Sequence, residues 1–206
     1  MVSVINYKAG NAPSVSNALR YLNIRCRLVW TPDQLEKSEK LILPGVGSAK
    51  ATMDSLRGMG LIEVLEKKVL SEKTPFLGIC IGHQILFDHS EEGNTRCLGW
   101  LKGNVAKFNK KKVRVPHIGW NEVKFNKKHQ LISGLQNSEF FYFVNSYYVL
   151  PDNKEIVFGE TQYGVDFCSA LLWKNIISTQ FHVEKSGPVG LRLLKNFAEL
   201  DKQELC

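Results

Sequence analysis

The stretch "PFLGICIGHQ", residues 75–84, decides the fold and raises the question of function. An apolar run leads into Cys80, which stands between Gly78 and Gly82, and a helix-like pattern follows. This is the spacing of a nucleophile elbow, whose sharp strand-to-helix turn leaves no room for a Cβ at either glycine. Such a turn lifts the sulfur to the carboxyl end of a sheet, makes the N–H of Ile81 an oxyanion donor, and lets the helix N-terminus favour the thiolate. A buried core cysteine at a strand end is the open alternative.

Strand and helix alternate through the first ninety residues, which predicts a mostly parallel central sheet flanked by helices. We expect strands at 2–7, 25–30, 40–45 and 75–80, and helices at 14–22, 31–38, 49–70 (broken near Gly58–Gly60) and 82–90. From about Trp100 short β-rich runs predict additional antiparallel or mixed strands, at 104–108, 121–125, 140–150, 155–162, 167–173 and 175–183. An amphipathic helix over 187–205 presents Leu191, Leu194, Phe197 and Ala198 on one face. The fold class is therefore α/β.

The net charge of +7 comes from one segment. Between Lys102 and Lys128 nine Lys or Arg face a single acid, Glu122, so this segment carries +8 and the remainder about −1. Lysines at strand tips commonly protect a sheet edge, and we interpret the segment in that way. An acidic protein partner and a nucleic acid are less favoured alternatives, and no nucleic-acid motif accompanies the charge.

Composition narrows the class of protein further. With 206 residues, the chain is long enough for a single domain with a substantial core. No stretch reaches the roughly 18 uncharged apolar residues of a membrane span. The five cysteines are odd in number and lack CxxC spacing, so we expect neither a disulfide framework nor a metal site, and no cofactor. The N-terminus lacks the features of a signal peptide, and a cytoplasmic location fits best.

A nucleophilic cysteine needs a base, and the sequence offers five histidines. His83 follows Cys80 by three residues on the expected helix and should point away from the sulfur, while His129 lies in a lysine-rich turn and should be solvated. His182 ends a strand-like run, so that it would reach the same rim of the sheet as Cys80. Glu184, two residues on, could orient its imidazole, as a triad requires. A capping or buried histidine is the alternative.

A second glycine turn follows another expected strand. Its residues, Pro44-Gly45-Val46-Gly47, could present backbone N–H groups to an anion, although an ordinary turn is an equal alternative.

The segments "LPGVG", "GICIGHQ" and "FHVEKS", in this order and spacing, resemble the class I (triad) glutamine amidotransferases. The resemblance covers residues 1–206 as a single glutamine amidotransferase domain. Four further segments are similar to one branch of that family, the glutaminase subunits of imidazole glycerol phosphate synthases: "NYKAGN", "PHIGWNEV", "FYFVNSYYV" and "QFHVEKSGPVGLRLLKNF".

The resemblance implies a glutaminase. Cys80 would attack the side-chain amide of glutamine, His182, held by Glu184, would protonate the departing ammonia, and water would hydrolyse the thioester. The oxyanion would rest on N–H groups of Ile81 and, after rearrangement, of Gly45, Val46 and Gly47. Glutamine would be held by Gly47, Gln84, Glu92, Ser146 and Tyr147.

The resemblance also implies a partner, a (βα)8-barrel cyclase that forms a heterodimer with this chain. Its interface would include Asn11, Trp120, Asn121, Tyr142 and Lys185. Physical chemistry favours such a partner as well. Ammonia released into neutral water becomes ammonium, which is not a nucleophile, so a separate acceptor subunit with a sheltered path is expected.

Several positions depart from the family pattern. Asn6 and Lys8 stand where Asp and a small residue are usual, His83 replaces a Met, Asn145 a His and Val183 a Pro. All three triad residues are present, but the departures leave two candidates for the enzyme that accepts the ammonia. Histidine biosynthesis is favoured, and the alternative is a paralogue that feeds a sugar-amidinating enzyme of surface-glycan synthesis. Two rival classes are a cysteine peptidase or esterase on a similar fold, which usually has His where Ile81 stands, and an inactive binding subunit, which would have lost the triad.

Overall fold

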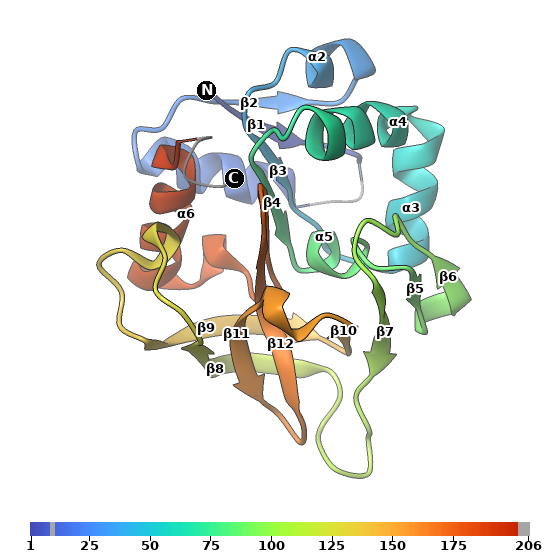
Figure 1. Cartoon of the computed structure of the whole chain (residues 1–206), viewed down its shortest axis with the longest axis vertical. Helices are drawn as coiled ribbons and strands as arrows, with labels where there is room; N and C mark the ends of the chain where they lie inside the picture. Colours follow the sequence, from blue (N-terminus) through green and yellow to red (C-terminus); the bar gives the residue numbers. More distant parts are fainter. Residues whose placement is uncertain (9–10, 202–206) are drawn as a thin grey trace.

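The computed structural model describes residues 1–8 and 11–201, and one mixed sheet runs through them (Figure 1). Five neighbouring strands of this sheet are parallel. Their order is β2 (Cys26–Val29), β1 (Val2–Ile5), β3 (Leu41–Leu43), β4 (Phe76–Ile79) and β13 (Ile176–Thr179). The turn after β4 is therefore flanked by the ends of β3 and β13.

Beyond β13 most strand pairs are antiparallel, and this half is built from the β-rich part of the sequence. The row continues with β12 (Asp166–Trp173), β10 (Tyr147–Pro151), β7 (Gly103–Lys107), β5 (His89–Ser90) and β6 (Thr95–Arg96). A branch from β12 adds β11 (Val157–Gln162), β8 (His117–Phe125) and β9 (Ser138–Asn145). The predicted fold class, a mostly parallel centre with mixed strands in the second half, is confirmed.

Helices cover both faces of the parallel strands (Figure 1). One face packs against α1 (Ala12–Tyr21) and α6 (Gly187–Glu199), and the other against α2 (Pro32–Glu36), α3 (Ala49–Gly58) and α4 (Leu61–Glu66). Four short helices join other elements: η1 (Lys67–Ser71), η3 (Gln130–Ile132), η4 (Lys154–Ile156) and η5 (Val183–Lys185). Alternation along β1 sends Val4 into one core and Ile5 into the other, which explains why its sequence is apolar throughout.

Most predicted helix starts are confirmed. The hydroxyl of Thr31 accepts from the N–H of Gln34 at the start of α2, and Pro13 lies in the first turn of α1. In α6, Leu194 and Phe197 are buried as expected, whereas Leu191 and Ala198 are only partly buried.

The prediction of a helix over residues 82–90 was wrong. Only one turn forms, α5 (Ile81–Gln84), after which the chain turns into β5 and the short helix η2 (Glu92–Asn94). The carbonyl of Ile85 accepts from the N–H of Leu98 instead of continuing the helix. Residues 85–87 are all fully buried, so this apolar run belongs to the core and not to one face of a helix.

The β-rich run at 140–150 is two strands and not one. It breaks at Ser146, where the chain leaves its pairing with β8 and joins β7 and β12. The expected strand at 175–183 ends early, at Thr179, and the chain beyond it carries His182 toward the elbow.

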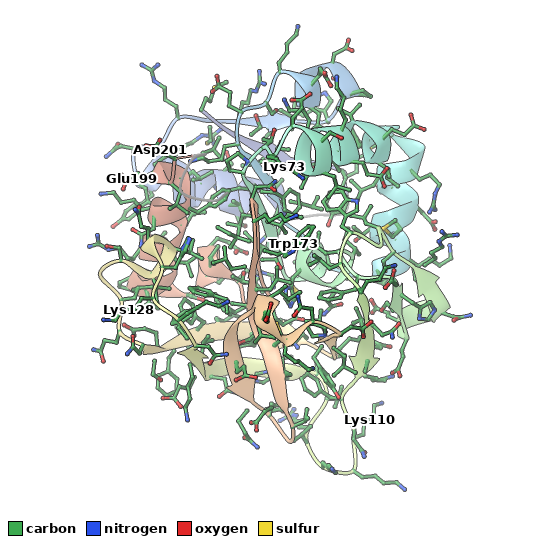
Figure 2. All side chains as sticks on the ribbon, in the orientation of Figure 1. Lys73, Lys110, Lys128, Trp173, Glu199 and Asp201 are labelled. Carbon is green, nitrogen blue, oxygen red and sulfur yellow. The ribbon has the colours of Figure 1, made fainter. Side chains whose placement is uncertain are left out.

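The basic segment lies at the periphery. Lys110 projects from the loop after β7, and Lys128 lies beyond the end of β8 (Figure 2). Both residues are exposed, in agreement with solvated strand tips. Within residues 1–8 and 11–201 no helix is long and apolar enough to span a bilayer.

Candidate active site

Cys80 occupies a strained turn between β4 and α5. Its φ of 56° and ψ of −105° place a non-glycine residue in a region that L side chains rarely adopt. A Cβ at Gly78 would lie 2.4 Å from the carbonyl oxygen of Gly82, and a Cβ at Gly82 would lie 2.1 Å from that of Leu43. The predicted elbow is therefore confirmed, with a steric reason for each glycine.

The two residues expected as base and orienting carboxylate, His182 and Glu184, lie on the chain that leaves β13. His182 Nδ1 donates to Glu184 Oε1 at 2.9 Å, and both side chains are at most 2% exposed. Burial lowers the pKa of His182, but hydrogen bonds with Cys80 and Glu184 outweigh burial and raise the pKa to about 10. The structure thus brings Cys80, His182 and Glu184 together, and the imidazole beside the sulfur holds a proton at neutral pH.

This arrangement changes the expected source of thiolate stabilisation. The sequence predicted a full helix behind Cys80, whose N-terminus would favour the thiolate. Because α5 is a single turn, the helix N-terminus expected behind Cys80 is short, and His182, whose pKa is raised, is the cationic group that lies against the sulfur.

The pocket in front of Cys80 has a volume of about 210 Å³. All five residues expected to hold glutamine line it: Gly47, Gln84, Glu92, Ser146 and Tyr147. Pro116, Val144 and Asn145 complete the wall. Glu92 Oε2 accepts from the N–H of Ala49 at 2.7 Å, which fixes the carboxylate at the pocket rim. The break in the strand at Ser146 is what allows the chain to form this wall.

The glycine loop after β3 abuts the elbow. A Cβ at Gly45 would lie 1.8 Å from Cγ2 of Ile81, so only glycine permits this close approach. Val46 is exposed, and Gly47 has a φ of 104°. Ile81 begins α5, where N–H groups have no partner within the helix. Both segments expected to supply oxyanion donors therefore lie beside Cys80.

The residues expected at a partner interface fall into four places. Trp120 and Tyr142 are cross-strand neighbours on the outer face of β8 and β9, with ring centroids 6.0 Å apart. Lys185 is exposed next to the triad. Asn121 points the other way, because its amide donates to the carbonyl of Gln162 on β11.

Asn11 is the fourth case, since it contacts Glu184 itself. Its Nδ2 donates to Glu184 Oε1 at 3.0 Å.

Two other histidines lie away from the sulfur. His83 is fully buried and bonds through Nδ1 to the hydroxyl of Ser178 at 2.6 Å, and burial lowers its pKa to about 3. The expectation that His83 is not the base is supported by this geometry. His129 is half-buried and accepts from the N–H of Leu131, so the expectation of a solvated side chain was wrong.

The sequence reasoning missed one residue at the sulfur, Gln180. It is fully buried, and its Nε2 lies 3.7 Å from Cys80 Sγ. The available signal was its position two residues before His182, in a run where alternate residues share a face.

Nothing in the described part of the chain suggests a metal centre. Across residues 1–8 and 11–201 no three His, Cys, Asp or Glu side chains are grouped so that they could hold an ion. The cysteines at 26, 80, 97 and 168 are all free thiols.

Comparison with known proteins places this geometry in a family. The family model for class-I glutamine amidotransferases matches residues 3–200. Solved structures agree in fold: one described as a glutamine amidotransferase superposes with a TM-score of 0.75 at 20% identity, covering 97% of this chain and 99% of that one. A chain of PurLQS from Thermotoga maritima gives 0.71 at 18% identity, covering 95% and 96%.

Relatives found by sequence share a much higher identity with this chain than these solved structures do. The imidazole glycerol phosphate synthase subunit HisH of Dehalococcoides mccartyi is 42% identical over 201 residues, 97% of either chain. The subunit HisH 1 of Campylobacter jejuni is 43% identical over 97% of this chain and 100% of its own length. On this identity and coverage, the protein belongs to the class-I glutamine amidotransferase family and, within it, to the imidazole glycerol phosphate synthase HisH subunits.

Proposed function

We propose that the protein is the glutaminase subunit of an imidazole glycerol phosphate synthase, which hydrolyses glutamine and passes the ammonia to a barrel-shaped cyclase subunit. One observation carries the proposal: Cys80, on its strained elbow, has the paired His182 and Glu184 on one side and a small polar pocket on the other. The whole domain, residues 1–206, serves this one reaction.

The first half of the reaction forms a thioester. The Cys80 thiolate attacks the carbonyl carbon of the glutamine side-chain amide, and the carbonyl oxygen becomes an oxyanion. The imidazolium of His182 donates its proton to the amide nitrogen, the carbon–nitrogen bond breaks, and ammonia leaves. The raised pKa of His182 means that this proton is present at neutral pH.

The second half regenerates the enzyme. Neutral His182 now accepts a proton from water, the hydroxide attacks the thioester, and glutamate leaves as the Cys80 thiolate is restored beside the imidazolium. Glu184 holds Nδ1 throughout, so that the other ring nitrogen faces the sulfur.

Backbone N–H groups would stabilise the oxyanion in both halves. Ile81 supplies one donor, and the loop of Gly45, Val46 and Gly47 supplies a second once it turns an N–H toward Cys80. Gln84 and Glu92, with the backbone at Gly47, Ser146 and Tyr147, would hold the amino-acid end of glutamine.

The cyclase partner is proposed to dock on the outer face of β8 and β9, here called the β8–β9 face. Its exposed apolar side chains are Ile118, Trp120, Phe140 and Val144, with Tyr142 beside them. Large exposed apolar residues grouped in this way favour a protein interface. Asn11 and Lys185 would contribute at its edge, and Asn121 through its main chain.

This face is connected to the base through the main chain. The N–H of His182 donates to the carbonyl of Tyr142 at 2.9 Å, and the hydroxyl of Ser186 bridges the N–H of Tyr142 and the carbonyl of His182. A partner on the β8–β9 face would therefore sit over the triad, where ammonia needs only a short sheltered path.

Histidine biosynthesis is the proposed pathway, in the cytoplasm. The alternative acceptor is a sugar-amidinating enzyme of surface-glycan synthesis. Purification of the chain with its bound proteins from native cells separates the two: a cyclase barrel alone supports the first, and an additional sugar amidotransferase supports the second.

The chemical proposal is tested with Cys80→Ala and an untagged cyclase. The variant should lose glutamine-dependent synthesis completely and keep the synthesis that added ammonium supports. Cys97→Ser replaces another buried thiol and is the control. It should keep both the glutamine-dependent and the ammonium-dependent synthesis. Retention of glutamine hydrolysis by Cys80→Ala would overturn the proposal.

A further inference from the structure

Gln180 links the sulfur of Cys80 to the substrate pocket. It lies between the end of β13 and His182, its side chain is fully buried, and its main-chain N–H donates to the carbonyl of Ser169 on β12 at 2.8 Å. Its side-chain Nε2 is 3.7 Å from Cys80 Sγ, and its Oε1 is 2.9 Å from Gln84 Nε2.

A backbone carbonyl fixes the orientation of both amides. Gln84 Nε2 donates to the carbonyl of Tyr147 at 3.1 Å, and a carbonyl can only accept. Gln84 must therefore turn its NH₂ group toward both Tyr147 and Gln180. Gln180 must then present its oxygen to Gln84, which leaves its NH₂ group facing the sulfur.

We propose that Gln180 is a further catalytic residue, which donates an amide N–H to the Cys80 sulfur and stabilises the thiolate together with His182. A buried amide cannot reorient for solvent, so its donor is in place before glutamine arrives. The carbonyl of Val144, 3.9 Å from the sulfur, can only accept and so favours the thiol. The N–H of Gln180, a donor, favours the thiolate instead.

The same chain of hydrogen bonds fixes which end of the Gln84 amide faces the pocket. Both hydrogens of its Nε2 are used by Tyr147 and Gln180. What Gln84 offers to the pocket is its Oε1, an acceptor. The group that it recognises must be a donor, and in the proposed substrate the α-ammonium group and the amide NH₂ have this chemistry.

The test measures the sulfur directly and does not need glutamine. Alkylation by iodoacetamide consumes only the thiolate, so the rate at Cys80 between about pH 6 and 9 reports how far the thiolate is stabilised. Gln180→Met keeps the length of the side chain and removes the donor. We expect its profile to move toward higher pH, with a rate at neutral pH about tenfold lower, as for loss of one hydrogen bond to a charged group.

Two further variants show whether a change in the alkylation rate is specific to the Gln180 donor. Gln180→Glu keeps the shape and places a carboxyl group at the sulfur; it should also lower the alkylation rate, and it serves in place of Gln180→Met if that variant does not fold. Gln162→Met, at an exposed position on β11, should react like the wild type. A folded Gln180→Met protein that is alkylated with the wild-type profile would overturn the proposal.

Steady-state kinetics with the cyclase give an independent readout, which rests on the proposed function. Gln180→Met should lower kcat while KM for glutamine changes by less than about threefold, whereas Gln84→Met should chiefly raise KM. If the wild-type complex hydrolyses no glutamine, the proposed function fails, and the alkylation profiles still decide the role of Gln180. A rise in KM alone for Gln180→Met, with normal alkylation, would mean that it only supports Gln84.

Discussion

Asn11 and His182 donate to the same carboxylate oxygen, Oε1 of Glu184, over 3.0 Å and 2.9 Å. The other oxygen, Oε2, is buried without a hydrogen-bond partner among the described residues. A single oxygen therefore carries both bonds, and the position of Asn11 bears directly on that of the base. Asn11 is also one of the residues expected at the partner interface, so with a partner bound this contact would join that interface to the triad.

Replacement of Asn11 by Ala should lower glutamine hydrolysis about three- to tenfold, because the carboxylate loses a hydrogen bond that orients it. The loss should appear in kcat and not in KM, measured as glutamate release with the cyclase present. Asn17→Ala, an exposed position on α1, is the matched control. Equal kcat for the two variants would contradict the role given to Asn11.

Trp120→Ala should weaken cyclase binding by at least about tenfold, since a large exposed aromatic side chain on an interface commonly dominates its affinity. Isothermal titration calorimetry with purified cyclase measures the change in Kd. Tyr21→Ala removes an even more exposed aromatic residue, at the C-terminal end of α1, and should bind as tightly as the wild type. If Trp120→Ala keeps the wild-type Kd, the cyclase docks elsewhere.

Acid should destabilise the protein through His83. Its pKa is lowered to about 3 by burial, whereas an unfolded histidine titrates near 6.5. Below pH 6.5 the unfolded chain binds a proton that the native chain does not, so the free energy of unfolding falls as the pH falls toward 3. One proton gives a slope of at most about 1.4 kcal/mol per pH unit.

His83→Met removes this contribution. Urea unfolding between about pH 7 and 5 should show a shallower decline for the variant than for the wild type. Parallel declines would mean that His83 is not held neutral in the native state.

Lys40 closes the C-terminal end of α6. Its Nζ donates to the carbonyls of Phe197, Ala198 and Leu200 at 3.0, 2.6 and 2.7 Å, where the helix leaves acceptors without partners. Lys40→Met should lower the free energy of unfolding by about 1–2 kcal/mol, measured by urea titration, with no change in alkylation of Cys80. Lys37→Met, at an exposed site nearby, should cost less than about 0.5 kcal/mol.

The sequence was sufficient for the parts of the site that are local. Gly78, Cys80 and Gly82 are close in the chain, and their steric relation follows from one turn. The pair of His182 and Glu184 is equally local. The fold class followed from the alternation of strands and helices, because that pattern admits few topologies.

Other parts depend on which distant segments meet. The one-turn length of α5 reflects pairing of Ile85 with Leu98, and the role of Gln180 requires Gln84, 96 positions away. Asn11 reaches Glu184 across 173 positions. Local propensity contains no information about such contacts, so the helix after the elbow was predicted too long and Gln180 was missed.

The alternation of β9 has a consequence for the history of such proteins. Phe140, Tyr142 and Val144 face outward, while Phe141 and Phe143 are fully buried between them. The side chains that a partner would contact on β9 are therefore encoded by different codons from the side chains that fill the core. Neither set includes Cys80, His182 or Glu184. A duplicated gene could drift at the outward positions and acquire a new acceptor enzyme while its chemistry stayed intact.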